Sequence, residues 1–155
     1  MWWQSMWRSI GRTRVFAPVA SRLLVADRWL SRVSKGRVVA LGMTPSLLLT
    51  CTGRKSGQPR RSPLQYVRDG DAYVVVGSNW GRDTDPAWVH NLAANPDATV
   101  GLAGADLPVT ATEATGAEHD RLWRLLLDQW PGYDLYLKRA PHRTFRIFRL
   151  APRPE

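Results

Sequence analysis

Short runs rich in apolar and β-branched residues, separated by turn residues, dominate the chain after residue 37. Each run has the length of a β-strand, which predicts strands over residues 38–43, 46–52, 64–68, 72–78, 98–103, 107–111 and 144–150. Asp-Gly-Asp at 69–71 and Gly-Ala-Asp at 104–106 each separate two of these runs, and Asp-Gly in that place is a strong hairpin signal. The pattern therefore indicates a sheet built largely from antiparallel hairpins.

Helical periodicity occurs in three places. Residues 19–33 carry an apolar stripe at 4-3-4-3 spacing, made by Val19, Leu23, Ala26, Leu30 and Val33. Asp85 and Pro86 have the chemistry of an N-cap and a first helical residue, and Asn-Pro at 95–96 ends that predicted helix. Residues 118–130 form the third predicted helix, with one face made by Leu122, Leu125, Leu126 and Gln129.

These elements predict an α+β fold, a small antiparallel β-barrel with helices packed outside it. The chain of 155 residues is one domain in size, large enough to bury about two thirds of its unfolded surface. Its net charge of +9 is uneven, because residues 1–40 hold eight basic side chains against one acid. We therefore expect a basic N-terminal segment, residues 1–37, followed by the barrel domain, residues 38–155.

The N-terminal segment combines its charge with four tryptophans: Trp2, Trp3, Trp7 and Trp29. A basic amphipathic helix with aromatic residues is suited to an anionic membrane surface. We expect residues 1–14 to contact such a membrane or a protein partner, and the amphipathic helix 19–33 to pack on the barrel. No base-stacking pattern points to nucleic acid. No apolar run approaches the ~20 residues of a membrane span, and no signal peptide is evident, so the predicted location is the cytoplasm or its membrane face.

The chain lacks the residues for demanding chemistry of its own. Its three histidines (His90, His119 and His142) are scattered, and the single cysteine, Cys51, excludes an internal disulfide and a zinc site. Cys51 lies in an apolar predicted strand, so we expect it to be buried. No metal is expected, and no Gly-x-Ser-x-Gly elbow is present. This composition favours a protein that borrows an organic cofactor.

The most informative stretch is residues 53–64, which hold two glycines, two prolines, two serines and the four cations Arg54, Lys55, Arg60 and Arg61. This composition predicts a loop. Glycines allow close approach to a ligand, and cations with hydroxyl groups suit a multiply charged anion such as a phosphate ester. The alternative is a solvated hairpin tip whose charges keep a sheet edge soluble. Neither the P-loop spacing nor a dinucleotide fingerprint is present.

Three blocks follow in order: Pro-Leu-Gln-Tyr-Val-Arg-Asp-Gly at 63–70, Tyr-Val-Val-Val-Gly-Ser-Asn at 73–79, and Asp-Pro-Ala-Trp-Val-His-Asn-Leu-Ala-Ala-Asn-Pro at 85–96. This ordered set resembles the deazaflavin-dependent nitroreductase family, actinobacterial proteins that bind coenzyme F-420. The resemblance covers about residues 47–100, with a weaker echo over 130–136. It implies a split β-barrel and F-420, whose phosphodiester and polyglutamate tail form a long anion.

The resemblance also implies a cofactor site. Its residues would be Arg54, Lys55, Ser56, Arg60 and Arg61 for the phosphate and tail, and Ser62, Pro63, Leu64, Gln65, Val76, Gly77, Ser78, Asn79, Ala87, Trp88, Val89, His90 and Asn91 around the ring system. For Trp88, a plain core contact with Leu92 is an equal alternative. His90 is better explained as a structural or surface residue than as a proton donor.

On the acceptor side, the resemblance points to Gln65, Trp130, Tyr133 and Tyr136, with Ser78 or Tyr133 as a hydroxyl source of the balancing proton. The alternative for the aromatic residues is that they plug the barrel mouth. The expected reaction is hydride transfer from reduced F-420 to a flat, electron-poor acceptor, a quinone first and nitroaromatics second. Gln65 and Trp130 differ from the aromatic and the tyrosine of some relatives, which weighs against bulky nitroimidazoles.

Two other functions fit parts of the sequence. A flavin mononucleotide enzyme on the same barrel would use a similar phosphate loop. A non-enzymatic module could bind a membrane or acidic partner through residues 1–37. Neither explains the ordered blocks in the middle of the chain.

Overall fold

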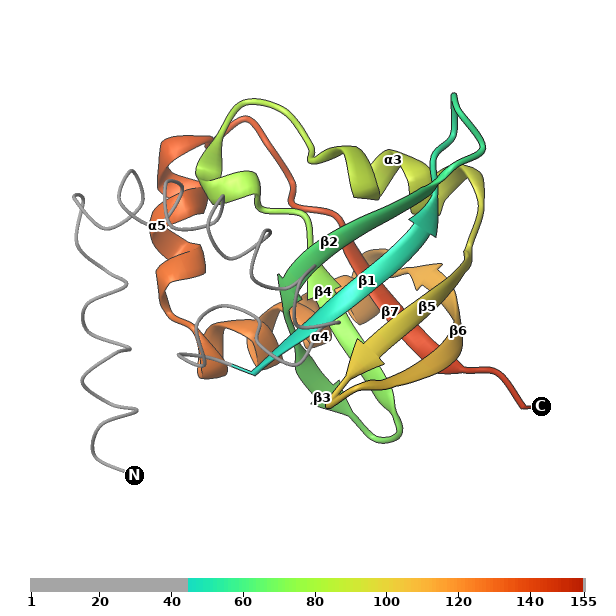
Figure 1. The fold of residues 1–155 in the computed structure, drawn as a ribbon. Coiled ribbons are helices and arrows are strands. Elements are labelled where there is room, and N and C mark those ends of the chain that lie inside the picture. Colours follow the sequence, from blue (N-terminus) through green and yellow to red (C-terminus); the bar gives the residue numbers. More distant parts are fainter. Residues whose placement is uncertain (1–44, 155) are drawn as a thin grey trace.

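The computed structural model describes residues 45–154 (Figure 1). The predicted basic segment 1–37, its amphipathic helix and the predicted strand 38–43 lie outside the described residues. Seven strands form one antiparallel sheet in the order β2-β1-β5-β6-β7-β4-β3. Their bounds are Ser46–Thr52 (β1), Pro59–Gln65 (β2), Val67–Asp69 (β3), Ala72–Val76 (β4), Asp97–Leu102 (β5), Ala105–Glu113 (β6) and Ile147–Pro152 (β7).

Three helices flank this curved sheet: Ala87–Ala94 (α3), Gly116–Gln129 (α4) and Gly132–Arg139 (α5). In Figure 1, α3 lies above the sheet, and α5 lies to its left. This arrangement confirms the predicted α+β fold. None of the helices formed by residues 45–154 is long and apolar enough to cross a membrane.

The core consists of two clusters, one on each face of the sheet. Leu47, Leu49 and Phe148 belong to the cluster that packs beneath α3. Leu122 and Leu126, on the predicted apolar face of α4, belong to the cluster on the opposite side. Strand β4 contributes Tyr73 and Val75 to the first cluster and Val74 and Val76 to the second, which explains why these four consecutive residues are buried. The buried position expected for Cys51 is confirmed, and burial raises the pKa of its thiol.

Both predicted hairpins are confirmed. Strands β3 and β4 pair with Asp69 opposite Ala72, which leaves a two-residue turn. Strands β5 and β6 pair with Leu102 opposite Ala105, so their turn is Ala103-Gly104, one residue earlier than predicted. Both turn residues have positive φ, at 49° and 81°, as a type I′ turn requires.

The prediction of a loop over residues 53–64 was wrong for its second half. Residues 59–65 form strand β2, which pairs with β1 along its full length. Within the described sheet β2 is an edge strand, where proline is tolerated if its nitrogen faces away from the neighbouring strand. Pro59 and Pro63 are four residues apart, so their nitrogens face the same side. Two prolines are therefore compatible with this strand.

Two further predictions need correction. Asp85 is not an N-cap, because Pro86 occupies that position and the Asp85 carboxylate accepts a hydrogen bond from Arg143 instead. Residues 132–139 form helix α5, which the sequence pattern did not predict because Pro131 and Gly132 suggested a break. The predicted end of α3 is confirmed, with Asn95 as its C-cap.

An ion-pair cluster fastens α4 to the β3–β4 hairpin. The Asp69 carboxylate accepts two hydrogen bonds from Arg121 of α4, at 2.9 and 3.0 Å, and one from Arg149 of β7, at 2.8 Å. These hydrogen bonds hold the pKa of Asp69 well below its usual range, and those from Arg121 contribute most. Because the folded-state pKa is depressed, this stabilisation is present above the unfolded pKa and is lost as the pH falls below it.

We expect Asp69→Asn to lower the melting temperature at pH 7 by about 2–5 °C, because one carboxylate serves two guanidinium groups. The difference from the wild type should shrink as the pH falls below about 4, where the unfolded-state carboxyl is protonated. Thermal melts across this pH range measure the effect. A difference that stayed constant down to pH 2 would contradict the assignment to the Asp69 charge.

Candidate functional site

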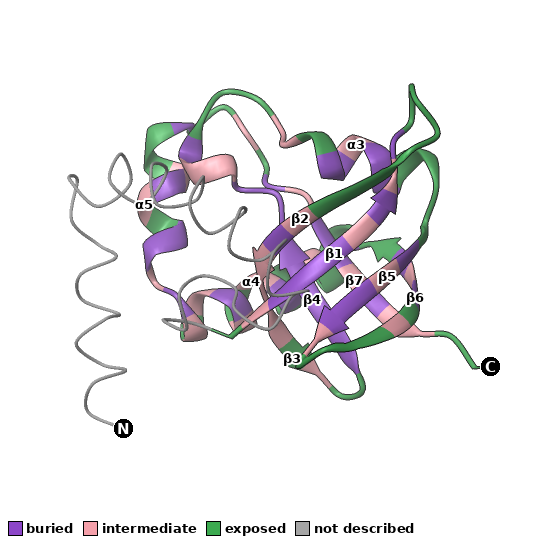
Figure 2. Cartoon of the chain, viewed as in Figure 1, coloured by how far each residue is buried: buried purple, intermediate pink, exposed green. Residues whose placement is uncertain are grey.

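The four cations of residues 53–64 lie at one end of the sheet. Arg54 and Lys55 lie in the turn between β1 and β2, and Arg60 and Arg61 lie in the exposed first half of β2 (Figure 2). None of the four forms an ion pair with a carboxylate of residues 45–154. By contrast, the described arginines that do pair with carboxylates include Arg121, Arg143, Arg146, Arg149 and Arg153. Among the described residues, this end of the sheet therefore carries positive charge that no carboxylate neutralises.

The turn has a defined conformation. Ser56 Oγ accepts hydrogen bonds from the Gln58 amide and from Arg60 Nη2, both at 3.2 Å. Asn91 of α3 fixes the other side of the turn, since its buried Oδ1 accepts the Arg54 amide at 3.0 Å. The structure thus brings predicted site residues of the turn and of α3 together. In it, the Asn91 side chain stabilises the turn.

Helix α3 also packs closely on the end of β4. A Cβ added to Gly77 would lie 2.5 Å from Val89 Cγ2, so only glycine fits between the strand end and the helix. At Gly77, the close approach to the backbone that the structure contains is that of helix α3, through Val89. Trp88 lies in the core edge-to-face with Phe148, with ring centroids 5.9 Å apart. This favours the structural interpretation of Trp88.

We expect Gly77→Ala to destabilise the protein by about 1–3 kcal/mol, because the new methyl group overlaps the Val89 side chain in a packed core. Urea unfolding measures the loss. The matched test is the same substitution in a Val89→Ala background, where the opposing methyl groups are gone and the cost should fall. An equal cost in both backgrounds would show that the contact with Val89 is not responsible.

Beyond Gly77 the chain makes a tight turn, η2 (Asn79–Gly81). Its three residues have positive φ values of 48°, 59° and 73°. Ser78, 8% exposed, precedes the turn, and Trp80 within it contacts Tyr136 of α5 edge-to-face at 5.8 Å. The predicted residues at the end of β4 are thereby joined to the predicted residues of α5.

Helix α5 also reaches β2. The Tyr133 hydroxyl donates a hydrogen bond to Gln65 Oε1 at 3.3 Å. Burial raises the pKa of Tyr133, and the neighbouring Tyr136 adds to this effect. The phenol therefore stays protonated at neutral pH. Burial likewise raises the pKa of Tyr136 to about 12. Both phenols are neutral hydrogen-bonding groups under physiological conditions.

These contacts form a closed circuit. The β1–β2 turn joins α3 through Arg54 and Asn91, and α3 joins the end of β4 through Val89 and Gly77. The turn after β4 joins α5 through Trp80, and α5 joins the end of β2 through Tyr133. Strand β2 with its turn, helix α3, the end of β4 and helix α5 are therefore linked in a ring of contacts, although they are distant in sequence.

The remaining predicted residues have more ordinary positions. Val76 and Trp130 are buried in the cluster beneath α4 and α5, and Pro63 is buried within β2. Ser62 and Leu64 are half-buried on β2, while Ala87 is exposed and His90 half-buried on α3.

Two residues of this region were not predicted. Trp80 links the strand end to α5, and Arg143 donates hydrogen bonds to the backbone of the segment after β4. Arg143 lies in an irregular stretch before the last strand, where no periodicity or motif marks it. Trp80 directly follows the second block of the family resemblance, residues 73–79, and only that position could have indicated it.

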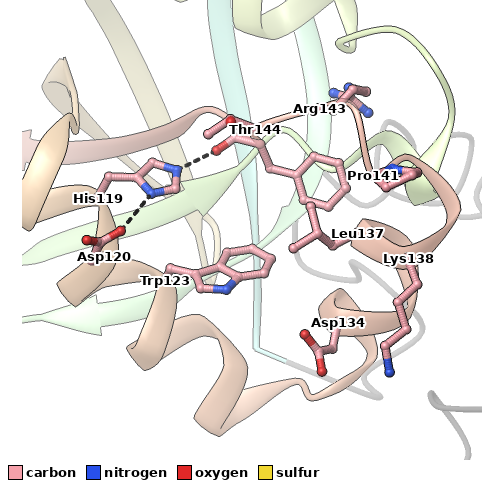
Figure 3. Close-up of a pocket in the computed structure, with 10 residues that line it drawn as sticks. His119, Asp120, Trp123, Asp134, Leu137, Lys138, Pro141, Arg143 and Thr144 are labelled. Atoms are coloured by element: carbon pink, nitrogen blue, oxygen red, sulfur yellow. Dashed lines mark hydrogen bonds and ion pairs between the residues drawn. The ribbon is translucent and has the colours of Figure 1, made fainter.

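A pocket of about 520 Å³ lies elsewhere, between α4, α5 and the chain before β7 (Figure 3). Trp123, Leu137 and Phe145 form its apolar part, and none of the predicted site residues lines it. No group of three or more metal-ligating side chains occurs among residues 45–154.

Solved structures with the same fold include an F420-dependent reductase. The chain shares the split-barrel fold with a solved F420-H2-dependent reductase, at a TM-score of 0.63 and 34% identity, over 68% of this chain and 93% of that one. A second solved structure, described as a domain-swapped dimer, matches at a TM-score of 0.65 and 30% identity over 81% of this chain and 96% of that one.

The sequence profile of the F420H(2)-dependent quinone reductase family matches residues 24–150. The chain belongs to this family. It is 45% identical over 87 residues to an F420H(2)-dependent quinone reductase of Mycobacterium tuberculosis, and the match covers 55% of this chain. It spans 58% of the length of that relative.

Proposed function

We propose that this protein reduces a quinone with electrons from reduced coenzyme F-420. The observation that carries the proposal is the set of four cations without carboxylate partners in the described chain, at one end of a strand whose other end contacts Tyr133. Family membership and the similarity to F420-dependent enzymes support the choice of cofactor.

The geometry favours an extended anion. Strand β2 places Pro59 and Gln65 at its two ends, six residues apart, which corresponds to about 20 Å. A ligand that contacts both the cations and the Gln65–Tyr133 pair must therefore be long. F-420, with its phosphodiester and glutamate tail, has this form, and its tail would give Arg54, Lys55, Arg60 and Arg61 several anionic partners.

Each part of the circuit has a proposed role. The cations and Ser56 hold the phosphate and tail, while Asn91 fixes the turn that carries them. Gln65, Trp130, Tyr133 and Tyr136 bound the acceptor side. When bound, reduced F-420 supplies the hydride. The hydroxyl groups of Ser78 and Tyr133 orient the acceptor carbonyl and pass on a proton from water. Binding two reactants side by side in a confined site supplies most of the rate enhancement.

The test is a fluorescence titration of the purified full chain with F-420, beside flavin mononucleotide at equal salt, followed by turnover of menadione. We expect micromolar or tighter binding of F-420 and oxidation of reduced F-420 that depends on the quinone. Saturation by flavin mononucleotide alone would transfer the protein to the flavin class. Binding of neither would leave the turn as a solvated hairpin tip.

The family and its relatives do not favour the nitroaromatic acceptor or the non-enzymatic alternative. Contact of residues 1–37 with an anionic membrane stays a prediction, and it would suit a lipid-soluble quinone. A chain without residues 1–37 that reduced membrane-embedded quinone as fast as the intact protein would contradict it.

A further inference from the structure

Arg143 turns its guanidinium into the fold although it lies in an irregular stretch before β7. Its side chain is 8% exposed. Nη1 donates to the carbonyl oxygens of Ser78 at 3.1 Å and Arg82 at 2.5 Å. Nη2 donates to the carbonyl oxygen of Gly77 at 3.0 Å and to Asp85 Oδ1 at 2.5 Å. All four acceptors belong to residues 77–85, between β4 and α3.

This segment contains backbone that needs support. Residues 79–81 all have left-handed φ values, which cost free energy for residues other than glycine, and two of the three are not glycine. Its own hydrogen bonds are few: the amide of Gly81 donates to Ser78 O, that of Arg82 to Asn79 O, and Asn79 Nδ2 to Thr84 O. The guanidinium binds the carbonyl groups on both sides of the left-handed residues, and so brackets them.

The bracket fixes two groups of the candidate site at once. The guanidinium binds the Ser78 carbonyl oxygen and so restrains the backbone that carries the Ser78 side chain. Trp80, inside the bracket, is held against Tyr136 of α5. Arg143 also lines the pocket between α4, α5 and the chain before β7 (Figure 3).

Simple charge neutralisation does not explain this arrangement. Asp85 accepts only one of the four hydrogen bonds, and the other three go to backbone carbonyl groups. A planar guanidinium can serve several acceptors in fixed directions, whereas an ammonium group acts as a point charge. The Phe145 ring, 4.8 Å from Arg143 Cζ, lies against the guanidinium and further restricts it.

We propose that Arg143 is a positioning residue for the reductase reaction, which holds residues 77–82 so that Ser78 and Tyr136 face the acceptor. The inference rests on the proposed function for its catalytic meaning, and on geometry alone for its effect on the segment. In this role Arg143 acts through the backbone of residues 77–82, whose carbonyl groups it binds.

The test compares Arg143→Lys with the wild type and with Arg121→Lys, a control that alters an arginine ion pair on α4 away from this segment. Three quantities are measured: F-420 affinity, kcat and KM with menadione, and hydrogen exchange of peptides covering residues 77–86 by mass spectrometry. For Arg143→Lys we expect F-420 affinity within about threefold of the wild type and kcat lower by about tenfold or more. Exchange at the amides of Gly81 and Arg82 should rise, with β1 unchanged.

Wild-type kcat and exchange in Arg143→Lys would overturn the proposal, as would an equal loss of kcat in Arg121→Lys. A wild type that does not reduce menadione would overturn the proposed function, while faster exchange confined to residues 77–86 in Arg143→Lys would still support the positioning role. If Arg143→Lys does not fold, Asp85→Asn replaces it, because it keeps an oxygen acceptor and removes the charge. The same local exchange change, smaller in size, is then expected, and its absence would overturn the proposal.

Discussion

Replacing Lys55 and Arg60 together by alanine is expected to weaken F-420 binding by about 100-fold or more. Each charge-assisted contact contributes about 1.5–3 kcal/mol, and exposure to solvent favours the lower end of that range. The structure supports a specific effect, because neither side chain has a carboxylate partner within residues 45–154 and Arg60 also bonds Ser56. Fluorescence titration at fixed salt measures the dissociation constant.

The matched control is Arg124→Ala with Lys138→Ala, which removes the same net charge from exposed positions on α4 and α5. Its affinity should stay within about threefold of the wild type, because these charges lie off the β1–β2 turn and are largely screened. Equal losses in the two double variants would show that only overall charge matters. The turn would then have no specific role.

Gly81→Ala is expected to lower the free energy of unfolding by about 2–4 kcal/mol. An added Cβ would lie 2.7 Å from the Tyr136 carbonyl oxygen and 2.9 Å from its Cα, and backbone atoms cannot rotate away. The φ value of +73° adds the cost of a left-handed residue. Urea unfolding followed by circular dichroism gives the free energy.

Gly70→Ala separates the two causes. Gly70 has a similar φ of +62°, but a Cβ there would meet no atom within 4 Å. We expect Gly70→Ala to lower the free energy of unfolding by about 1 kcal/mol, which is the cost of the left-handed backbone alone. If both substitutions cost the same, the contact between the turn after β4 and α5 does not limit this position, and the circuit around the site is looser than the structure indicates.

The parts of this fold that could be predicted from sequence depend on local signals. Both hairpins carry Gly next to Asp or Ala between β-rich runs, and α4 has a regular apolar stripe. Strand β2 could not be predicted, because its residues Pro-Arg-Arg-Ser-Pro have low strand propensity and pair only because β1 lies beside them. Helix α5 follows a Pro-Gly pair that normally ends helices, and its stability comes from burying Tyr133 and Tyr136.

The candidate site divides in the same way. Its candidate members could be assigned from the basic stretch 53–64, from the three blocks that follow it and from the weaker resemblance over 130–136. The side chains that hold these segments together could not be assigned. The hydrogen bond between Asn91 and the Arg54 amide joins residues 37 positions apart, and those from Arg143 to Ser78 and Arg82 span 65 and 61 positions. Such contacts depend on tertiary packing, for which a single sequence carries no local signal.

The two prolines of β2 have a consequence for association. Sheet edges commonly recruit another chain's backbone, and they do so through rows of free amide donors. Pro59 and Pro63 leave the same side of β2 without donors at two positions, beside the like charges of Arg60 and Arg61. Within residues 45–154, this border of the sheet is therefore poorly suited to pairing with a second polypeptide strand, while its cations favour a small diffusing anion. The residues that make β2 hard to recognise in the sequence thus also discourage edge-to-edge association.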